Sequence, residues 1–181
     1  MKRALPTMFT ILALAPGMAL AQSDTRSVQV KRGEYLVTIG LCHDCHTPMT
    51  KGADGPGPDM SRALSGHPQD IVVKAPATLP EPWAGAMSPT LTAWSGPWGV
   101  SFSANLTPDK DTGVLRDFTE EQFVQTLRTG RHQGQGRKIL PPMPWPLISK
   151  MTDDDLKAVF AYLRQIPAVR NKVPDPIPPA K

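Results

Sequence analysis

The sequence contains little cysteine and no second long apolar run, and both shortages restrict what the chain can be. Two cysteines among 181 residues allow at most one disulfide bond. After residues 8–20, no apolar run approaches the roughly 20 residues of a membrane-spanning helix, so we expect the mature protein to be soluble. There is also no basic stripe interleaved with aromatic residues, which argues against nucleic-acid binding. The lack of an internal repeat argues against a tandem of two similar domains.

The first 21 residues have the layout of a secretory signal peptide. Lys2 and Arg3 precede the apolar run, and the Ala-Leu-Ala of residues 19–21 forms a small-x-small cleavage site. No cysteine follows that site, so no lipid anchor is expected. The sequence therefore predicts export to the bacterial periplasm, with residues 22–27 as a short N-terminal extension.

A single domain is predicted over residues 28–167, and a proline-rich tail at 168–181 is expected to be extended. Between residues 47 and 105 the chain is rich in Gly, Pro and Ser and has no helical period, which indicates an insertion at about 50–104. Such a long irregular connection is uncommon unless something anchors it. Apolar residues at helical spacing predict three helices, and two short pieces within the insertion are candidate strands. The helices are expected at 28–46, from Thr119 to Gly130 and from Thr152 to Pro167, and the strands at 71–74 and 99–104.

Capping patterns define the starts of the second and third helices. Thr119 is followed three residues later by Gln122, and Thr152 is followed three residues later by Asp155. A Thr with an acidic or amide residue at that spacing is typical of a helix N-terminus.

The central chemical signal is the pentapeptide Cys-His-Asp-Cys-His at residues 42–46. Positions i, i+3 and i+4 of a helical turn lie on one face, so Cys42, Cys45 and His46 are expected to point the same way. Two thiols can bond the two vinyl groups of one porphyrin while the imidazole binds its iron, and this pattern is typical of c-type haem attachment. We therefore predict one covalent haem c held by Cys42 and Cys45, with His46 as the proximal iron ligand.

Three other uses of the two cysteines stay open. A redox-active Cys-x-x-Cys pair normally starts a helix after a strand, whereas the upstream context here is helical. A zinc site would need a further donor from His43, His67, His132 or a carboxylate, and no second paired motif is present. A simple disulfide between the two cysteines is the third alternative.

Met143 is the predicted distal iron ligand. It lies in the stretch ILPPMPWP at residues 139–146, whose four prolines stiffen the backbone. A stiff strap can hold a thioether over a metal with little ordering cost, and Met/His ligation raises the reduction potential of haem. The alternatives are an ordinary proline-rich loop with a packing methionine, or a second histidine ligand from His67 or His132.

Several further residues are candidates for the surroundings of the haem. Asn105 begins a turn of the Asx type that is expected beside the haem. Three aromatic residues are candidates for packing on the haem edge: Trp94, Trp98 and Trp145. Three cationic residues are candidates for pairing with a haem propionate: Arg131, Arg137 and Lys138.

Taken in order, five stretches resemble the class I c-type cytochrome family. They are the motif at 42–46, NLTPDKDTG from Asn105, TEEQFVQTLRTGRH from Thr119, ILPPMPW ending at Trp145, and MTDDDLKAVFAYLRQIP from Met151. The stretches are particularly similar to the single-haem domains in cytochrome subunits of bacterial alcohol and aldehyde dehydrogenases. The resemblance covers about 28–50 and 99–167. It implies an all-α cytochrome c fold with three core helices around one haem, with His46 as proximal and Met143 as distal ligand.

Electron transfer is the function that these features predict. Ligation by His46 and Met143 would close both axial sites of the iron, so we expect an electron carrier rather than an enzyme. Its expected partners are redox proteins: a dehydrogenase as donor, and an oxidase or another cytochrome as acceptor. Because the resembling subunits usually carry three such domains and this chain has one, a free shuttle or a small electron-accepting subunit is favoured. The alternatives are a haem enzyme whose substrate pocket is formed by residues 47–105, and a sensor or assembly module.

Overall fold

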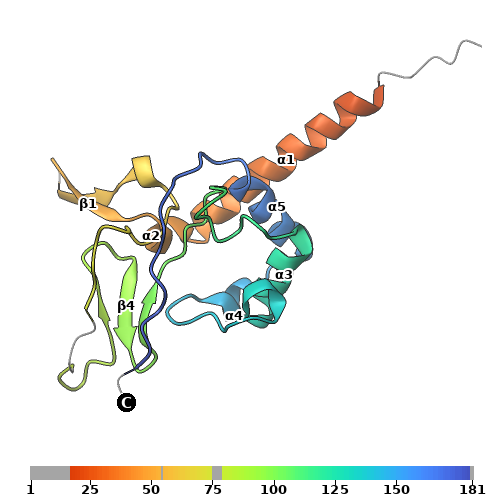
Figure 1. Cartoon of the computed structure of the whole chain (residues 1–181). Coiled ribbons are helices and arrows are strands. Elements are labelled where there is room, and N and C mark those ends of the chain that lie inside the picture. The colour runs from red at the N-terminus through yellow and green to blue at the C-terminus, as the bar shows by residue number, and fades with distance from the viewer. Residues whose placement is uncertain (1–16, 54, 75–78, 180–181) are drawn as a thin grey trace, which may run out of the picture.

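The computed structural model describes residues 17–53, 55–74 and 79–179 (Figure 1). The signal peptide predicted for residues 1–21 therefore lies mostly outside the described residues. Within the described ranges, no helix combines the length and the apolar character needed to cross a membrane. The helices are α1 (Gly17–Ile39), α2 (Cys42–His46), α3 (Glu120–Thr129), α4 (Trp145–Ile148) and α5 (Asp153–Leu163). The strands are β1 (Met49–Gly52), β2 (Gly55–Pro58), β3 (Ala86–Met87), β4 (Ala93–Gly96) and β5 (Gly99–Phe102).

The helix expected at 28–46 is two helices, because the chain turns sharply between α1 and α2. Leu41 adopts a left-handed conformation, with φ of 57°, which a non-glycine residue rarely takes. This turn gives the pentapeptide a helix of its own. Cys42, Cys45 and His46 consequently share the short helix α2 and the spacing that the motif requires.

Local sequence signals define α3 and α5 as expected. Thr119 accepts from the Gln122 amide while Gln122 accepts from the Thr119 amide, which completes a capping box at α3. Gly130 ends α3 in a left-handed conformation with φ of 65°, as glycine readily does. The Thr152 side chain accepts from the Asp155 amide and caps α5.

The two longest helices cross where the chain has a glycine. A Cβ atom built on Gly33 of α1 would lie 2.0 Å from the Ala158 carbonyl oxygen of α5, so only glycine permits this approach. Leu36 and Val37 of α1 and Leu156 and Val159 of α5 are buried at the crossing. Apolar residues of α3 and of the segment before it complete the same core: Leu115, Phe118, Phe123, Val124 and Leu127.

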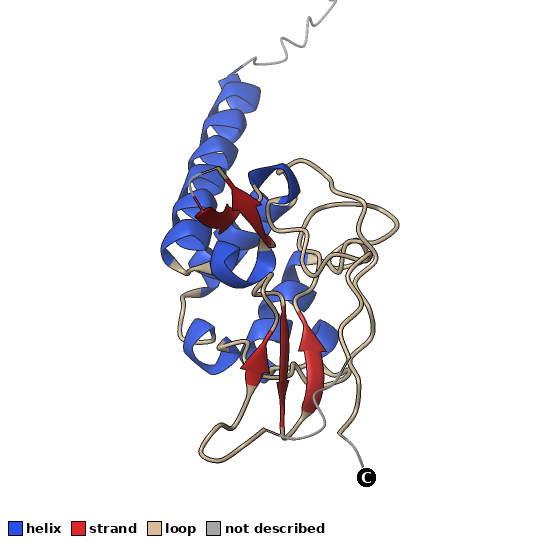
Figure 2. Ribbon diagram, turned by 90° about the vertical axis from the view of Figure 1, so that its left-hand side faces the viewer, coloured by secondary structure: helices blue, strands red, loops and turns tan. Residues whose placement is uncertain are grey.

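The prediction of an all-α fold is wrong, because over the described residues two small antiparallel sheets accompany five α-helices and make the fold mixed (Figure 2). The strands β1 and β2 pair with each other, and the second sheet has the order β3-β4-β5. Both sheets lie in the segment treated above as an irregular insertion. The candidate strand at 99–104 is confirmed over Gly99–Phe102, whereas residues 71–74 form no strand.

The proline-rich tail is extended, but it is also docked on the domain. Ile177 pairs with Val100 of β5 through two backbone hydrogen bonds of 2.8 and 2.9 Å. Asn171 is 1% exposed, and its side-chain amide donates to the carbonyl oxygens of Ser65 and His67. The tail therefore belongs to the folded domain and ties β5 to the loop that follows the motif.

Candidate functional site

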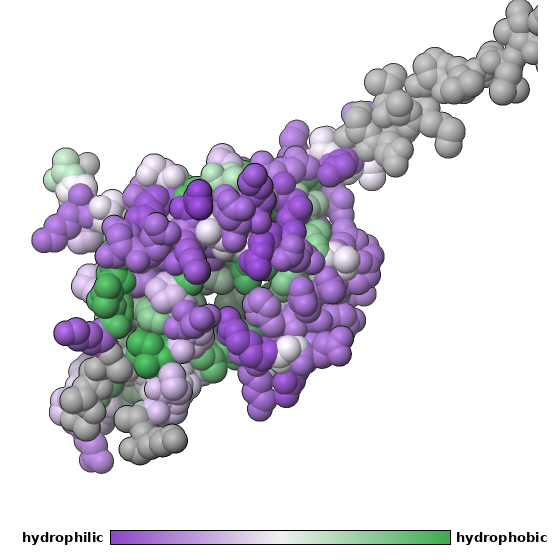
Figure 3. Space-filling model, viewed as in Figure 1, coloured by the Kyte–Doolittle hydropathy of each residue, from purple (hydrophilic) through white to green (hydrophobic). Residues whose placement is uncertain are grey.

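An apolar cavity of about 460 Å³ opens beside α2. In Figure 3 the molecule is hollowed at its centre, between the α3 and α5 region and the three-stranded sheet. Cys42, Cys45, His46 and Met143 all line this cavity. Most of the remaining wall is apolar and comes from the helical core, including Leu36, Phe118, Phe123, Leu127, Leu156 and Val159. The cavity thus brings together all four residues that the sequence selects for haem attachment and ligation.

His46 is held in the orientation and tautomer that a metal ligand needs. The ring is 8% exposed, and its Nδ1 lies 2.8 Å from the carbonyl oxygen of Ala104. Because a carbonyl only accepts hydrogen bonds, Nδ1 carries the proton and Nε2 keeps its lone pair. Burial also lowers the pKa of His46, which favours the neutral imidazole that binds metals.

The two cysteine thiols are free and lie in an environment that disfavours thiolates. Burial raises the pKa of Cys42 to about 11, and burial also raises the pKa of Cys45. A redox-active pair needs the opposite shift. In the described part of the chain, no three His, Cys, Asp or Glu side chains gather as a metal site. The zinc and thiol-redox alternatives therefore find no support in this geometry.

Met143 reaches the cavity from the strap, which we define as residues 140–143. It is half-buried, packs against the hydrophobic core and follows the cis peptide bond between Pro141 and Pro142. The helix α4 begins two residues after it. The strap and α2 therefore supply a thioether and an imidazole to the same cavity.

The two rival histidines occupy different positions. His67 is fully buried, does not line the cavity, and uses Nδ1 with Thr92 and Nε2 with the Ile71 carbonyl oxygen. With both nitrogens engaged it has no lone pair for iron. His132 does line the cavity, where it packs edge-on against Phe118 with ring centroids 5.4 Å apart.

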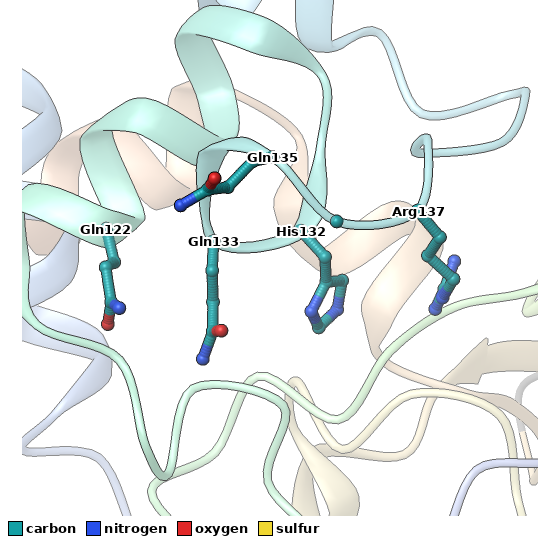
Figure 4. Close-up of a pocket in the computed structure, with 6 residues that line it drawn as sticks. Gln122, His132, Gln133, Gln135 and Arg137 are labelled. Atoms are coloured by element: carbon teal, nitrogen blue, oxygen red, sulfur yellow. The ribbon is translucent and has the colours of Figure 1, made fainter.

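A polar pocket of about 600 Å³ lies next to the apolar cavity. His132 and Arg137 line both spaces. Figure 4 shows the side chains of Gln122, Gln133, His132 and Arg137 pointing in the same direction, from α3 and the turn after it. One rim of the apolar cavity therefore carries a cation and several hydrogen-bond donors.

Several predicted neighbours of the haem lie elsewhere. Of the three candidate tryptophans only Trp94 lines the cavity, and of the three candidate cations only Arg137 does. Trp98 packs over Gly96, and Trp145 packs over Gly130. Asn105 forms the expected Asx turn, since its Oδ1 accepts from the Thr107 amide, but it lies outside the cavity and bonds the tail at Val169.

Sequence reasoning named Trp94 but missed the rest of one cavity wall, which the three-stranded sheet provides. Trp94 of β4 and Ser101 of β5 are paired across the strands and both line the cavity. Residues directly opposite in an antiparallel pair lie on the same face, so this register turns both side chains to the site. Phe102, Ser103 and Ala104 extend the same wall. The available signals were Trp94 as a candidate for the haem edge and the candidate strand that begins at residue 99, without its pairing.

The cavity fits a porphyrin in size and in polarity. Its volume falls within the about 300–1,000 Å³ typical of cofactor sites. A haem has an apolar ring and two carboxylates at one edge, which matches an apolar cavity whose rim carries Arg137 and polar side chains. With two thiols at i and i+3 and a prepared imidazole at i+4, the site defines a protein that binds haem covalently.

Known proteins support that class. No protein-family model matches the chain. The chain is 30% identical over 168 residues to the cytochrome c subunit of a quinone alcohol dehydrogenase from Gluconobacter oxydans, which covers 91% of this chain and 27% of the relative. It is 33% identical over 159 residues to a gluconate 2-dehydrogenase cytochrome c subunit from Pantoea cypripedii. That match covers 86% of this chain and 28% of the relative. A diheme cytochrome c-type protein of Cereibacter sphaeroides is 28% identical over 159 residues, a match that covers 86% of this chain and 42% of the relative.

The chain belongs to the c-type cytochrome family and is similar to cytochrome subunits of bacterial dehydrogenases. It spans about a quarter of the length of the first two relatives. Since nine-tenths of the chain is matched to the first relative, residues 47–105 are part of the similarity. The resemblance is therefore wider than the five stretches in the sequence indicate.

Proposed function

We propose that this chain is a periplasmic electron carrier with one covalent haem c. Cys42 and Cys45 would form the thioether links, and His46 and Met143 would bind the iron from opposite sides. The observation that carries the proposal is the convergence of these four side chains on one apolar cavity. When bound, the haem supplies an iron that alternates between ferric and ferrous states.

The protein's own residues would keep this site closed to substrate. His46 is fixed by the Ala104 carbonyl oxygen, and Met143 is carried by a proline-stiffened strap. The apolar wall excludes water, and a thioether ligand favours the ferrous state, so a raised potential is expected. Arg137 at the polar rim is placed to pair with a propionate.

The axial ligand is tested by replacing Met143 with Ala. We expect the ferric Met143→Ala protein to lose the weak far-red band of a Met-ligated haem, and its potential to fall. Met87→Ala is the matched control, because Met87 is 67% exposed and does not line the cavity. A variant at Met143 that keeps both the band and the potential would show that another group, with His132 the first candidate, binds the iron.

We further propose that the redox donor is a dehydrogenase. Two of the relatives named above are, by their names, cytochrome c subunits of dehydrogenases. The test is affinity purification of the tagged protein from its native host without denaturant. A dehydrogenase in fixed stoichiometry would indicate a permanent subunit. If the tagged protein elutes without a partner but is rapidly reduced by a dehydrogenase of the same host, it is a free shuttle. If no dehydrogenase either copurifies with the protein or reduces it, the proposal is contradicted.

Export to the periplasm is the third part of the proposal and rests on the sequence of residues 1–21. Mass spectrometry of the protein from its host is expected to find Gln22 as the first residue. An N-terminus that still carries Met1 would contradict export by a cleaved signal peptide.

A further inference from the structure

The three-stranded sheet contacts the strap through one buried side chain. Ser101 of β5 is 6% exposed, and its hydroxyl donates to the carbonyl oxygen of Pro141 at 2.5 Å. These residues are 40 positions apart in the chain. The contact therefore connects the segment before Asn105 directly to the backbone that carries Met143.

A second side chain fixes the direction of that hydroxyl. The indole N–H of Trp98 donates to Ser101 Oγ at 3.2 Å. A serine hydroxyl has a single proton, and two carbonyl oxygens lie within its reach, that of Pro141 at 2.5 Å and that of Trp94 at 3.5 Å. The much shorter distance assigns the proton to Pro141. Chained hydrogen bonds of this kind strengthen one another. The Trp98 ring is itself seated over Gly96, where a Cβ atom would meet it at 2.5 Å.

The strap has few other polar attachments. In the described part of the chain, the hydrogen bond from Ser101 is the only one that joins residues 140–143 to another segment, and the nearest neighbouring one runs from the Ile139 amide to the Gly130 carbonyl oxygen at 2.8 Å. Pro141 and Pro142 have no amide proton to donate. Packing holds Met143 from the core side, with Met151 and Ile148 in the same cluster, while Ser101 holds the strap from the sheet side.

We infer that Ser101, oriented by Trp98, is a positioning residue that keeps the Met143 thioether over the iron. The inference deepens the proposed function and rests on Met143 being the distal ligand. It gives the sheet formed by β3, β4 and β5 a role, which is to support the distal side of the haem site. Ser101 does not touch the iron, and it acts only through the Pro141 carbonyl.

The test compares ferric Ser101→Ala, Ser101→Thr and Ser95→Ala holoproteins. Ser95 lies on β4 of the same sheet and does not line the cavity, so Ser95→Ala is the matched control. The readouts are the rate of cyanide binding to the iron and the temperature at which the weak far-red band disappears. For Ser101→Ala we expect cyanide binding about threefold to tenfold faster, as for the loss of one buried hydrogen bond, and an earlier loss of the band. Ser101→Thr retains the hydroxyl, so its cyanide-binding rate and far-red band should match those of wild type. Ser95→Ala should match wild type as well.

Two results would overturn the inference. One is a Ser101→Ala protein whose cyanide rate and band equal those of wild type. The other is a Ser101→Thr protein that is as impaired as Ser101→Ala, since packing rather than the hydroxyl would then be responsible. Failure of the proposed function gives a different result: the band would be absent from wild type, or unchanged in Met143→Ala.

Discussion

Replacing Gly33 with Ala should destabilise the protein, although the same change would stabilise an ordinary exposed helix. In the interior of a helix, Ala is favoured over Gly by about 1 kcal/mol. At Gly33, however, the new Cβ would lie 2.0 Å from the Ala158 carbonyl oxygen and 2.8 Å from Tyr162 Cβ. A loss of stability in Gly33→Ala would therefore show that α1 and α5 cross closely at Gly33, whereas a gain would show that they do not.

The size of the loss in stability depends on which atoms the new Cβ would displace. Ordinary van der Waals contact of a Cβ begins at 3.4 Å, and the nearest atom belongs to the backbone of α5, so no side-chain rotation relieves the overlap. Overpacking of this kind costs about 3 kcal/mol at the upper end of the usual range. After the gain in helix propensity, we expect a net loss of about 2 kcal/mol. For a domain of this size that corresponds to a fall in Tm of roughly 4–8 °C.

The assay is the unfolding of the haem-loaded protein by denaturant and by heat, monitored by the circular dichroism signal of its helices. Gly57→Ala is the control, because a Cβ at Gly57 has nothing within 4 Å, and its effect should stay within about 0.5 kcal/mol. If Gly33→Ala proves as stable as wild type or more stable, the close crossing of α1 and α5 is refuted.

Three further changes test the packing around the site. Thr119→Ala removes the cap of α3 and should cost about 1 kcal/mol in urea unfolding, whereas Thr119→Ser should cost little; equal losses would contradict the capping role. Asn171→Ala leaves the buried carbonyl oxygens of Ser65 and His67 without a donor and should cost about 2–4 kcal/mol, so a neutral effect would contradict docking of the tail. Burial lowers the pKa of His67 below its ordinary 6.5, so the unfolded chain takes up a proton more readily and the free energy of unfolding should fall as pH drops below 6.5. The fall should be shallower in His67→Gln, and equal pH profiles would refute this role.

The elements that the sequence predicted are those set by local interactions. The capping pairs that begin at Thr119 and Thr152 involve residues three positions apart, and the haem motif occupies one helical turn. Such signals do not depend on the rest of the fold. The predicted starts of α3 and α5 and the grouping of Cys42, Cys45 and His46 on one helical turn are accordingly found in the structure, whereas the first helix begins at Gly17 rather than at residue 28.

Apart from β5, the strands could not be predicted, because they are short and have poor local propensity. The strand β2 reads Gly-Pro-Gly-Pro, and β3 has only two residues, although Gly and Pro are depleted in strands. Pairing between distant segments forms them instead. The same holds for the wall of the cavity, because the contact of Ser101 with Pro141 depends on the register of β4 and β5 and on the path of the strap.

The break after α1 and the docked tail were missed for the same physical reason. A leucine in the left-handed region at position 41 has no local sequence signal. The tail reads as an extended proline-rich end, and only the buried amide of Asn171 and the pairing of Ile177 with Val100 keep it on the domain. Both features depend on contacts across the fold.

The most direct measurement of the central claim is the mass of the purified, denatured protein together with its pyridine haemochrome spectrum. We expect one haem per chain that stays attached under denaturing conditions, with a spectrum shifted by two thioether links. Changing either Cys42 or Cys45 to Ala should leave at most one such link. A colourless protein whose two sulfurs are joined to each other or bind zinc would contradict the account.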